Sequence, residues 1–299
     1  MIDLSQLSPE VARGLVPGAL AGNVTDEAKG AVREGVGTVM SEATDDEVVA
    51  LLQAFGKVGE GFKLHPADPL ARRISHAFIP ALIPSHEVVG LDRALAACAA
   101  GPTLWLSNHF SYVDTQATDY LLALCGADDL AQRIVAVAGP KVYGTPFRKM
   151  ASVCLNTLKT AQSTRLSHNQ AELSPREVAR IAINTLRTAD AFAREGRPIL
   201  VYAEGARSRT GRLQPFLKAV SKYARAPGIQ VIPVSISGTA ELYPIDAELM
   251  RPAPVRLVLG DPVPAEEFGR VGALEECWRR VAAGLPEAHR PLPETPVTA

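Results

Sequence analysis

The sequence of 299 residues lacks the features that mark several protein classes. Its four cysteines (Cys98, Cys125, Cys154 and Cys277) are widely spaced, with no Cys-x-x-Cys and no paired histidines, which argues against a disulfide scaffold and a zinc site. Aromatic residues make up only 5% of the chain, which disfavours nucleic acid as a partner because base stacking needs them. Lysine and arginine (31) nearly balance aspartate and glutamate (32), so the chain as a whole is not a polyelectrolyte.

A long hydrophobic run is also missing. The longest stretch without Asp, Glu, Lys or Arg, residues 94–113, is interrupted by Gly101-Pro102 and Asn108-His109, so no transmembrane helix is predicted. The N-terminal sequence MIDLSQLS resembles neither a secretory signal nor a transit peptide. Together with the sparse cysteines, this predicts a cytoplasmic protein, peripheral at the inner face of a membrane if it meets one at all.

Charge is distributed unevenly along the chain. Residues 131–230 contain 17 basic and 5 acidic residues, a net charge of +12, whereas the segments before and after them are net acidic. A concentrated basic segment indicates an anionic ligand, although solvated helix faces give the same composition. Composition alone leaves both interpretations open.

Helix signals dominate the first 80 residues. Thr25 precedes one helical pattern, Asp45-Asp46-Glu47 opens a second, and Asp68-Pro69 starts a third. We therefore predict a helical N-terminal region over residues 1–80.

From Val88 onward, short apolar runs alternate with helical patterns. The predicted strands are 103–106, 134–138, 199–202, 231–235 and 255–259. The clearest helix, 175–195, has Ser174 as its cap and Glu177 to complete a capping box. The alternation predicts an α/β domain over 81–285, with a mixed, largely parallel sheet flanked by helices and a helical N-terminal extension. The proline-rich residues 286–299 are predicted to form a disordered tail.

One segment is a candidate for contact with a membrane surface. Residues 74–84 (ISHAFIPALIP) follow Arg72-Arg73, which places apolar side chains beside a small basic pair. The alternative is buried packing between a helix and the sheet, which such stretches more often provide.

A histidine and an aspartate follow the predicted strand 103–106. His109 and Asp114 are separated by four residues in a loop that leads into a helix, and strand ends are where α/β enzymes place reactive groups. Imidazole is the natural base near neutral pH, and a carboxylate on its other nitrogen fixes the tautomer. The alternative is a structural loop histidine.

An arginine-rich loop follows the predicted strand 199–202. It runs from Glu204 through Gly205 to Arg207, Arg209 and Arg212. Guanidiniums at alternate positions in a glycine-bearing loop can converge on one anion, and arginine suits bidentate recognition of phosphate. An exposed basic turn would have the same sequence.

Other catalytic signatures are missing. Ser235 and Ser237 lie in an apolar strand without the Gly-x-Ser-x-Gly elbow of serine hydrolases, and neither a phosphate-binding Gly-x-x-x-x-Gly-Lys loop nor a dinucleotide-binding Gly-x-Gly-x-x-Gly occurs after a strand. Pro233 within 231–238 should restrict that strand's hydrogen bonding to one side or place it at an edge.

The combination of these motifs carries a family resemblance. Asn-His-x-x-x-x-Asp at 108–114, Glu-Gly-x-Arg at 204–207, and an apolar strand with an internal proline resemble the glycerolipid acyltransferase superfamily, which includes glycerol-3-phosphate and lysophosphatidic acid acyltransferases. The resemblance covers about Val88 to Gly238. It implies an O-acyltransferase of phospholipid synthesis that moves a fatty acyl group from acyl-CoA or acyl carrier protein to a glycerol phosphate acceptor.

Two acceptors are compatible with the resemblance. Glu204-Gly205-Ala206-Arg207-Ser208 looks like the lysophosphatidic acid branch, and we expect 1-acyl-sn-glycerol-3-phosphate on that ground. The Arg207-x-Arg209 pair is similar to the soluble plastid enzymes, which makes glycerol 3-phosphate the alternative.

The resemblance also assigns roles to residues. His109 is implied as the base and Asp114 as the residue that orients it; Arg207 and Arg209 are implied to bind the acceptor phosphate, helped by Lys159 and Lys141. Lys159 stands where the family has arginine. Glu204 and Gly205 are implied to position the acceptor or the arginine loop, and neither a metal nor a cofactor is required. A non-catalytic lipid-binding protein, and a hydrolase that uses His109 and Asp114 on water, are the competing interpretations.

Overall fold

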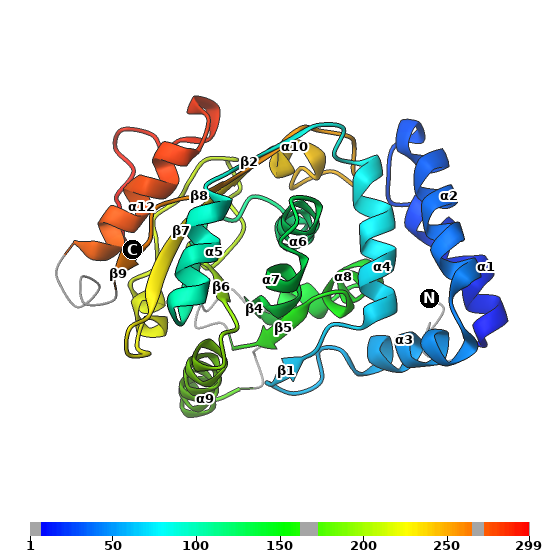
Figure 1. Ribbon diagram of the computed structural model, residues 1–299, viewed down its shortest axis with the longest axis horizontal. Coiled ribbons are helices and arrows are strands. Elements are labelled where there is room, and N and C mark those ends of the chain that lie inside the picture. The colour runs from blue at the N-terminus through cyan, green and yellow to red at the C-terminus, as the bar shows by residue number, and fades with distance from the viewer. Residues whose placement is uncertain (1–6, 162–172, 265–271, 299) are drawn as a thin grey trace.

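The computed structural model describes residues 7–161, 173–264 and 272–298; residues 1–6, 162–172, 265–271 and 299 lie outside it. A sheet runs through the centre of the molecule (Figure 1), with strand order β1-β5-β4-β6-β3-β7-β8-β2 and with β9 paired to β7. The strands are β1 (Leu64–His65), β2 (His86–Val89), β3 (Thr103–Ser107), β4 (Val135–Ala138), β5 (Asn156–Lys159), β6 (Ile199–Tyr202), β7 (Gln230–Ser237), β8 (Val255–Leu259) and β9 (Val263–Pro264).

The sheet is mixed and largely parallel, as predicted. Strands β5, β4, β6, β3 and β7 are parallel neighbours. Strand β8 pairs with β7 in the antiparallel sense, and β2 is parallel to β8. All five predicted strands occur, and the very short β1, β2, β5 and β9 complete the sheet.

Pro233 lies in a central strand, not at an edge. On one side β7 pairs with β3 over Gln230–Val234. On the other side it pairs first with β9 at Gln230–Val231 and then with β8 from Val234 to Ser237. Pro233 falls between these two stretches, where the Gly260 amide donates to the Pro233 carbonyl at 2.8 Å. The missing N–H of proline therefore coincides with an interruption of the ladder, which is why proline is tolerated here.

Helices cover both faces of the sheet because side chains alternate along each strand. Leu104 and Leu106 of β3 belong to one buried cluster together with residues of α9 and α12, whereas Trp105 belongs to the cluster on the other face together with α4, α6 and α7. The helices after β2 are α5 (Leu91–Ala100), α6 (Asp114–Leu124), α7 (Asp128–Arg133), α8 (Pro146–Val153), α9 (Pro175–Arg194), α10 (Thr239–Leu242) and α12 (Ala273–Gly284). In α9 the predicted capping box of Ser174 and Glu177 is present.

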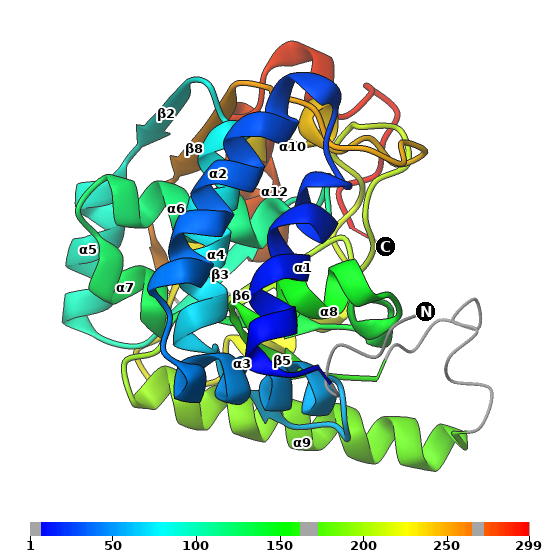
Figure 2. The ribbon, with the colours of Figure 1, turned by 90° about the vertical axis from the view of Figure 1, so that its right-hand side faces the viewer.

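The N-terminal region contains α1 (Pro9–Ala21), α2 (Asp26–Glu42), α3 (Asp45–Lys57) and α4 (Pro69–Phe78). Figure 1 shows α1 and α2 at the end of the molecule opposite α12, and Figure 2 shows them in front of α4. The predicted helical region also includes β1, which pairs with β5. Buried residues from Ala12 to Leu259 form one continuous cluster, so this region shares its core with the sheet. None of the described helices combines the length and apolar character needed to cross a membrane.

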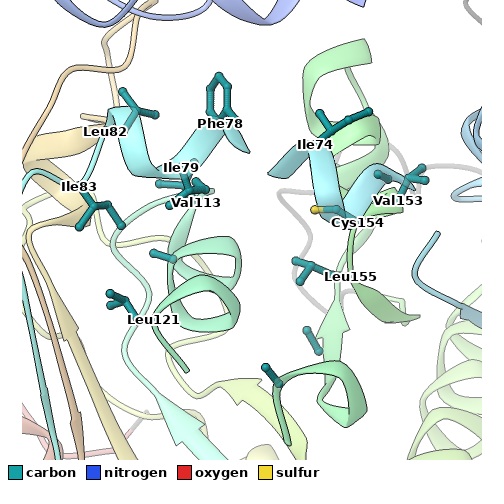
Figure 3. Close-up of a cluster of buried hydrophobic side chains, with 14 of the residues drawn as sticks. Ile74, Phe78, Ile79, Leu82, Ile83, Val113, Leu121, Val153, Cys154 and Leu155 are labelled. Carbon is teal, nitrogen blue, oxygen red and sulfur yellow. The ribbon is translucent and has the colours of Figure 1, made fainter. Parts of the chain in front are cut away.

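The segment considered for membrane contact is part of the core. Ile74, Ile79 and Leu82 are almost fully buried, and Figure 3 shows them within a cluster of apolar side chains that includes Val113 of the loop before α6. Arg72 is also engaged inward, because it donates to the Asp119 and Asp128 carboxylates. The apolar side chains pack against other helices instead of facing solvent, so residues 74–84 provide the buried packing that such stretches more often provide.

Candidate active site

The two predicted motifs meet at the carboxyl ends of neighbouring parallel strands. His109 follows β3, the Glu204–Arg212 loop follows β6, and these strands are paired directly. The Ser208 amide donates to the His109 carbonyl at 2.8 Å, and the Ala203 amide donates to the Ser107 carbonyl at 2.9 Å. The histidine loop and the arginine loop are therefore held together by backbone hydrogen bonds, although they lie far apart in the sequence.

Asn108 links the histidine loop to the next strand. Its side chain donates to the Ile236 carbonyl and accepts from the Ile236 amide, both at 2.9 Å. The side-chain amide thus takes the place of a backbone peptide in the ladder with β7. Because Asn108 is fully buried, these two bonds also satisfy its polar atoms, and they fix the starting position of the loop.

His109 and Asp114 form a close pair. The Nδ1 atom of His109 lies 2.8 Å from Oδ2 of Asp114, and the side chains are 15% and 1% exposed. The same carboxylate oxygen accepts from the Phe110 and Ser111 amides. Since Asp114 can only accept, Nδ1 carries the proton and Nε2 keeps its lone pair. No residue in the described part of the chain hydrogen-bonds to Nε2, so this atom is available as a base.

Two tyrosines that the sequence analysis does not single out surround the histidine. The Tyr202 ring stacks on the His109 ring at 4.2 Å between centroids with a 24° interplanar angle, and its hydroxyl hydrogen-bonds to Thr115 Oγ1 at 2.7 Å. The Tyr112 ring meets His109 edge to face at 6.3 Å. These contacts restrict the imidazole orientation, with Nδ1 directed toward Asp114. Tyr202 is the last residue of β6, and Tyr112 lies inside the motif at residues 108–114. The presence of aromatic residues at the motifs was the sequence signal that could have indicated these ring contacts.

Arg207 and Arg209 differ in their surroundings. The Arg207 guanidinium lies 4.2 Å above the centre of the Tyr112 ring, beside His109, and its Nη2 donates to the Ile245 carbonyl at 3.5 Å. Burial lowers the pKa of Arg207, but a guanidinium stays charged at any physiological pH. Arg209 is exposed. The structure therefore places Arg207 beside the Tyr112 ring that contacts the histidine, and leaves Arg209 exposed.

The predicted lysines are placed differently from each other. Lys159, at the end of β5, donates to the Gly59 carbonyl and lies against the rings of Phe62 and Tyr143, at 5.1 and 5.3 Å. Burial lowers its pKa. Its ammonium is thus already engaged by a carbonyl and two aromatic faces. Lys141, in the short 3-10 segment Pro140–Tyr143, has an exposed side chain.

Glu204 and Gly205 shape the start of the arginine loop. The buried Glu204 side chain accepts from the Gln214 amide at 3.2 Å through Oε1, while Oε2 has no described partner. Burial raises the pKa of Glu204 to about 9, and the nearby Asp114 adds to the shift, so the carboxyl is neutral at pH 7. Gly205 has φ of 72°, and a Cβ there would overlap the Leu217 side chain. The turn out of β6 therefore needs glycine.

Replacing Glu204 with glutamine should change how stability depends on pH. Because folding raises the carboxyl pKa from 4.5 to about 9, the wild-type protein loses stability as pH rises between these values, since the unfolded chain ionises freely. A glutamine side chain cannot titrate, so the melting temperature of Glu204→Gln minus that of wild type should increase from pH 5 to pH 8.5. Thermal unfolding across this range tests the expectation. The matched control is Glu248→Gln, which alters an exposed glutamate; equal pH dependence in both variants would contradict a neutral Glu204.

The C-terminal segment is ordered against the arginine loop, in contrast to the predicted disorder. His289 Nδ1 donates to the Gly211 carbonyl at 2.7 Å, and Nε2 lies 3.0 Å from Glu241. Both partners are hydrogen-bond acceptors, and the bond to Glu241 raises the pKa of His289. The Leu213 amide donates to the His289 carbonyl, and Arg212 donates to the Arg290 carbonyl at 3.0 Å. The Arg212 side chain is thus bonded to the C-terminal segment, and backbone carbonyls of His289 and Arg290 accept hydrogen bonds from Leu213 and Arg212.

A small apolar pocket lies near the histidine loop, between mostly buried side chains. Its lining comes from α1, α4, α6, α8 and the loop before α6, and includes Ile74, Phe78, Val113, Phe147 and Cys154. Val113 directly precedes Asp114, so the pocket adjoins the residue that holds His109. Several of its lining residues are labelled in Figure 3.

Comparisons with known proteins identify the family of this chain. The sequence profile of the acyltransferase family matches residues 86–237. A chloroplastic 1-acyl-sn-glycerol-3-phosphate acyltransferase of Brassica napus is 28% identical over 54% of this chain and 41% of its own. A 1-acyl-sn-glycerol-3-phosphate acyltransferase of Cocos nucifera is 23% identical over 63% of this chain and 56% of its own. The chain thus spans about half the length of these curated relatives.

A solved structure is similar in fold. The crystal structure of the 1-acyl-sn-glycerophosphate acyltransferase PlsC from Thermotoga maritima superposes with a TM-score of 0.50 and 18% identity, over 91% of this chain and 97% of the other. The profile match covers the sheet from β2 to β7 and contains both motifs of the site. The chain therefore belongs to the acyltransferase family, within the glycerolipid acyltransferase superfamily.

Proposed function

We propose that this protein transfers a fatty acyl group from an acyl thioester, acyl-CoA or acyl carrier protein, to the hydroxyl of 1-acyl-sn-glycerol-3-phosphate. The observation that carries the proposal is the His109–Asp114 pair, whose free Nε2 lies in the same site as the Arg207 guanidinium. A base beside a cation suits an acceptor that has both a hydroxyl and a phosphate. The named relatives, which act on this acceptor, support the choice.

The reaction follows from the positions of these groups. His109 Nε2 takes the proton of the acceptor hydroxyl as its oxygen attacks the thioester carbonyl carbon. The tetrahedral intermediate collapses with cleavage of the C–S bond, and the imidazolium returns the proton to the thiolate. Asp114 stabilises the imidazolium between these steps through its bond to Nδ1. The chemistry needs no metal or cofactor, and the protein supplies no covalent nucleophile.

The apolar pocket suits the acyl chain of the thioester only if it widens. A fatty acyl chain needs an apolar environment close to the carbonyl carbon, and the pocket is lined by Val113 next to Asp114. Most of its lining side chains are buried, so they would have to move apart to admit the chain. A location in the cytoplasm, at the surface of a membrane, stays a prediction. Residues 74–84 give it no support, because their apolar side chains are buried.

The experiment that tests the proposal is thiol release by the purified protein. Octanoyl, palmitoyl and oleoyl thioesters of coenzyme A and of acyl carrier protein are each offered with 1-acyl-sn-glycerol-3-phosphate, glycerol 3-phosphate or no acceptor. Turnover only with the lysophospholipid is the expected result. Turnover with glycerol 3-phosphate alone would select the soluble-type alternative, which the Arg207-x-Arg209 pair favours. Release without any acceptor would indicate a hydrolase, and binding of lipid without turnover a non-catalytic protein.

Replacing Arg207 with alanine should weaken acceptor binding. A hydrogen bond to a charged group contributes about 1.5 to 3 kcal/mol, so the KM for the acceptor should rise about tenfold to a hundredfold with a smaller change in kcat. Initial rates at saturating thioester measure this. Arg225→Ala, which removes an exposed arginine, controls for net charge. If the thioester KM rises instead and the acceptor KM does not, Arg207 contacts the donor.

A further inference from the structure

A second arginine lies beside Arg207. Arg148, in α8, has its guanidinium carbon 4.0 Å from the centre of the Tyr112 ring, and the guanidinium carbon of Arg207 lies 4.2 Å from the centre of the same ring. Both guanidiniums therefore contact the same tyrosine ring. The Tyr112 ring in turn meets His109 edge to face, so both cations lie beside the base.

This pair of positive charges has no carboxylate partner within the described residues. Arg148 Nη1 donates to the Lys141 carbonyl at 3.3 Å, and Arg207 Nη2 donates to the Ile245 carbonyl. By contrast Arg72, another partly buried arginine, bonds to the carboxylates of both Asp119 and Asp128. Each guanidinium has five N–H donors, so most donors of the pair remain free.

Two neighbouring like charges repel each other when they are partly withdrawn from water. The effect is visible in Arg207, whose pKa is lowered by burial and also by the charge of Arg148. The Tyr112 ring offsets some of this repulsion, because cations are attracted to the face of an aromatic ring. An anion at the edge of the ring, within reach of N–H donors of both guanidiniums, would neutralise the rest. Two cations that contact one aromatic ring and have no carboxylate partner among the described residues are therefore suited to binding an anion.

We infer that Arg148 is a second anchor for the phosphate of the acceptor and, with Arg207, selects a phosphate monoester over an uncharged acceptor. This inference rests on the proposed function. A dianionic phosphate has acceptor oxygens for two guanidiniums, whereas a neutral glycerol hydroxyl offers neither charge nor enough oxygens. Since Arg148 comes from α8 and Arg207 from the loop after β6, the site also ties these two segments together when it is filled.

The test compares Arg148→Ala and Arg148→Lys with wild type. At saturating thioester, Arg148→Ala should raise the KM for 1-acyl-sn-glycerol-3-phosphate about tenfold, while kcat and the thioester KM change less than about threefold. Arg148→Lys should recover part of the loss, since it keeps the charge but not the planar fork. The ratio of kcat/KM for the phosphorylated acceptor to kcat/KM for monoacylglycerol should fall by the same factor as the KM for the phosphorylated acceptor rises. Lys149→Ala is the matched control, because Lys149 is the next residue of α8 and its ammonium lies over the Phe55 ring.

A second measurement separates this inference from the proposed reaction. Calorimetric titration with inorganic phosphate and with glycerol 3-phosphate should show binding to wild type and to Lys149→Ala, and at least tenfold weaker binding to Arg148→Ala. If the protein binds phosphate through Arg148 but transfers no acyl group, the proposed function fails and the anion site stands. If it transfers acyl groups and Arg148→Ala leaves both acceptor KM and phosphate binding unchanged, the inference is overturned. A rise in thioester KM alone would also overturn it, because the pair would then bind the donor.

Discussion

Replacing His109 with alanine should lower the rate of acyl transfer about a thousandfold. General-base catalysis by a positioned side chain increases a rate by a factor of about 10² to 10⁴. Among the described residues, His109 is the histidine that bonds to Asp114, so the variant has no imidazole to replace it. The fold should persist, because Asp114 still accepts from the Phe110 and Ser111 amides. The measurement is thiol release at saturating thioester and acceptor, with circular dichroism to confirm folding.

The chain provides its own control for this variant. His76 of α4 also bonds to a buried aspartate, with Nε2 2.7 Å from Asp119, but it belongs to the cluster that joins α4 to α6. His76→Ala should therefore reduce stability by about 1 kcal/mol and leave kcat unchanged within a factor of about three. More than a tenth of wild-type activity in His109→Ala would reject His109 as the base.

Replacing Asp114 with asparagine should reduce kcat about a hundredfold or more. The Oδ2 atom of Asp114 accepts three hydrogen bonds, from His109, Phe110 and Ser111. If the asparagine places its NH₂ group there, it donates to Nδ1 and forces the proton onto Nε2, which removes the base. If it places its oxygen there, the NH₂ group takes the position of Oδ1, which is buried without a described partner. An unsatisfied buried donor costs about 1 to 3 kcal/mol.

Both orientations therefore have a measurable consequence. Activity at saturating substrates reports the tautomer, and chemical denaturation reports the unsatisfied donor. The Phe110 and Ser111 amides favour the asparagine oxygen at the Oδ2 position, so the loss of activity then comes from the missing negative charge, which no longer stabilises the imidazolium. The matched change Asp119→Asn removes the charge of the aspartate beside His76 and should affect stability without a comparable loss of kcat. Wild-type kcat together with wild-type stability in Asp114→Asn would contradict the proposed positioning role.

Much of the fold was predictable from local patterns. The alternating apolar strands and helices fixed the α/β class, and the caps fixed helices such as α9, because these signals depend on neighbouring residues. Strand β1 has only two residues, and β5 (Asn156–Lys159) begins and ends with polar residues, so neither forms an apolar run that could be recognised. Strand β1 forms because its backbone finds a partner in β5, which is a tertiary event.

The candidate site shows the same division. His109 and Asp114 lie in one short loop whose own amides hold the carboxylate, so their pairing could be predicted from spacing. The contact of Arg148 and Arg207 with Tyr112, the engagement of Lys159 with Gly59, and the tail's hold on the arginine loop could not. Each of these joins segments far apart in the chain.

The sequence by itself therefore determined the family, the pairing of His109 with Asp114, and the loop that carries Arg207, because the residues of each motif are close in the chain and their geometry is local. Only the tertiary structure decided which cations lie near His109. The order of strands in the sheet brings the loop after β6 beside the loop after β3, and the packing of α8 brings Arg148 to Tyr112. These contacts depend on how distant segments cross, which neither periodicity nor spacing encodes.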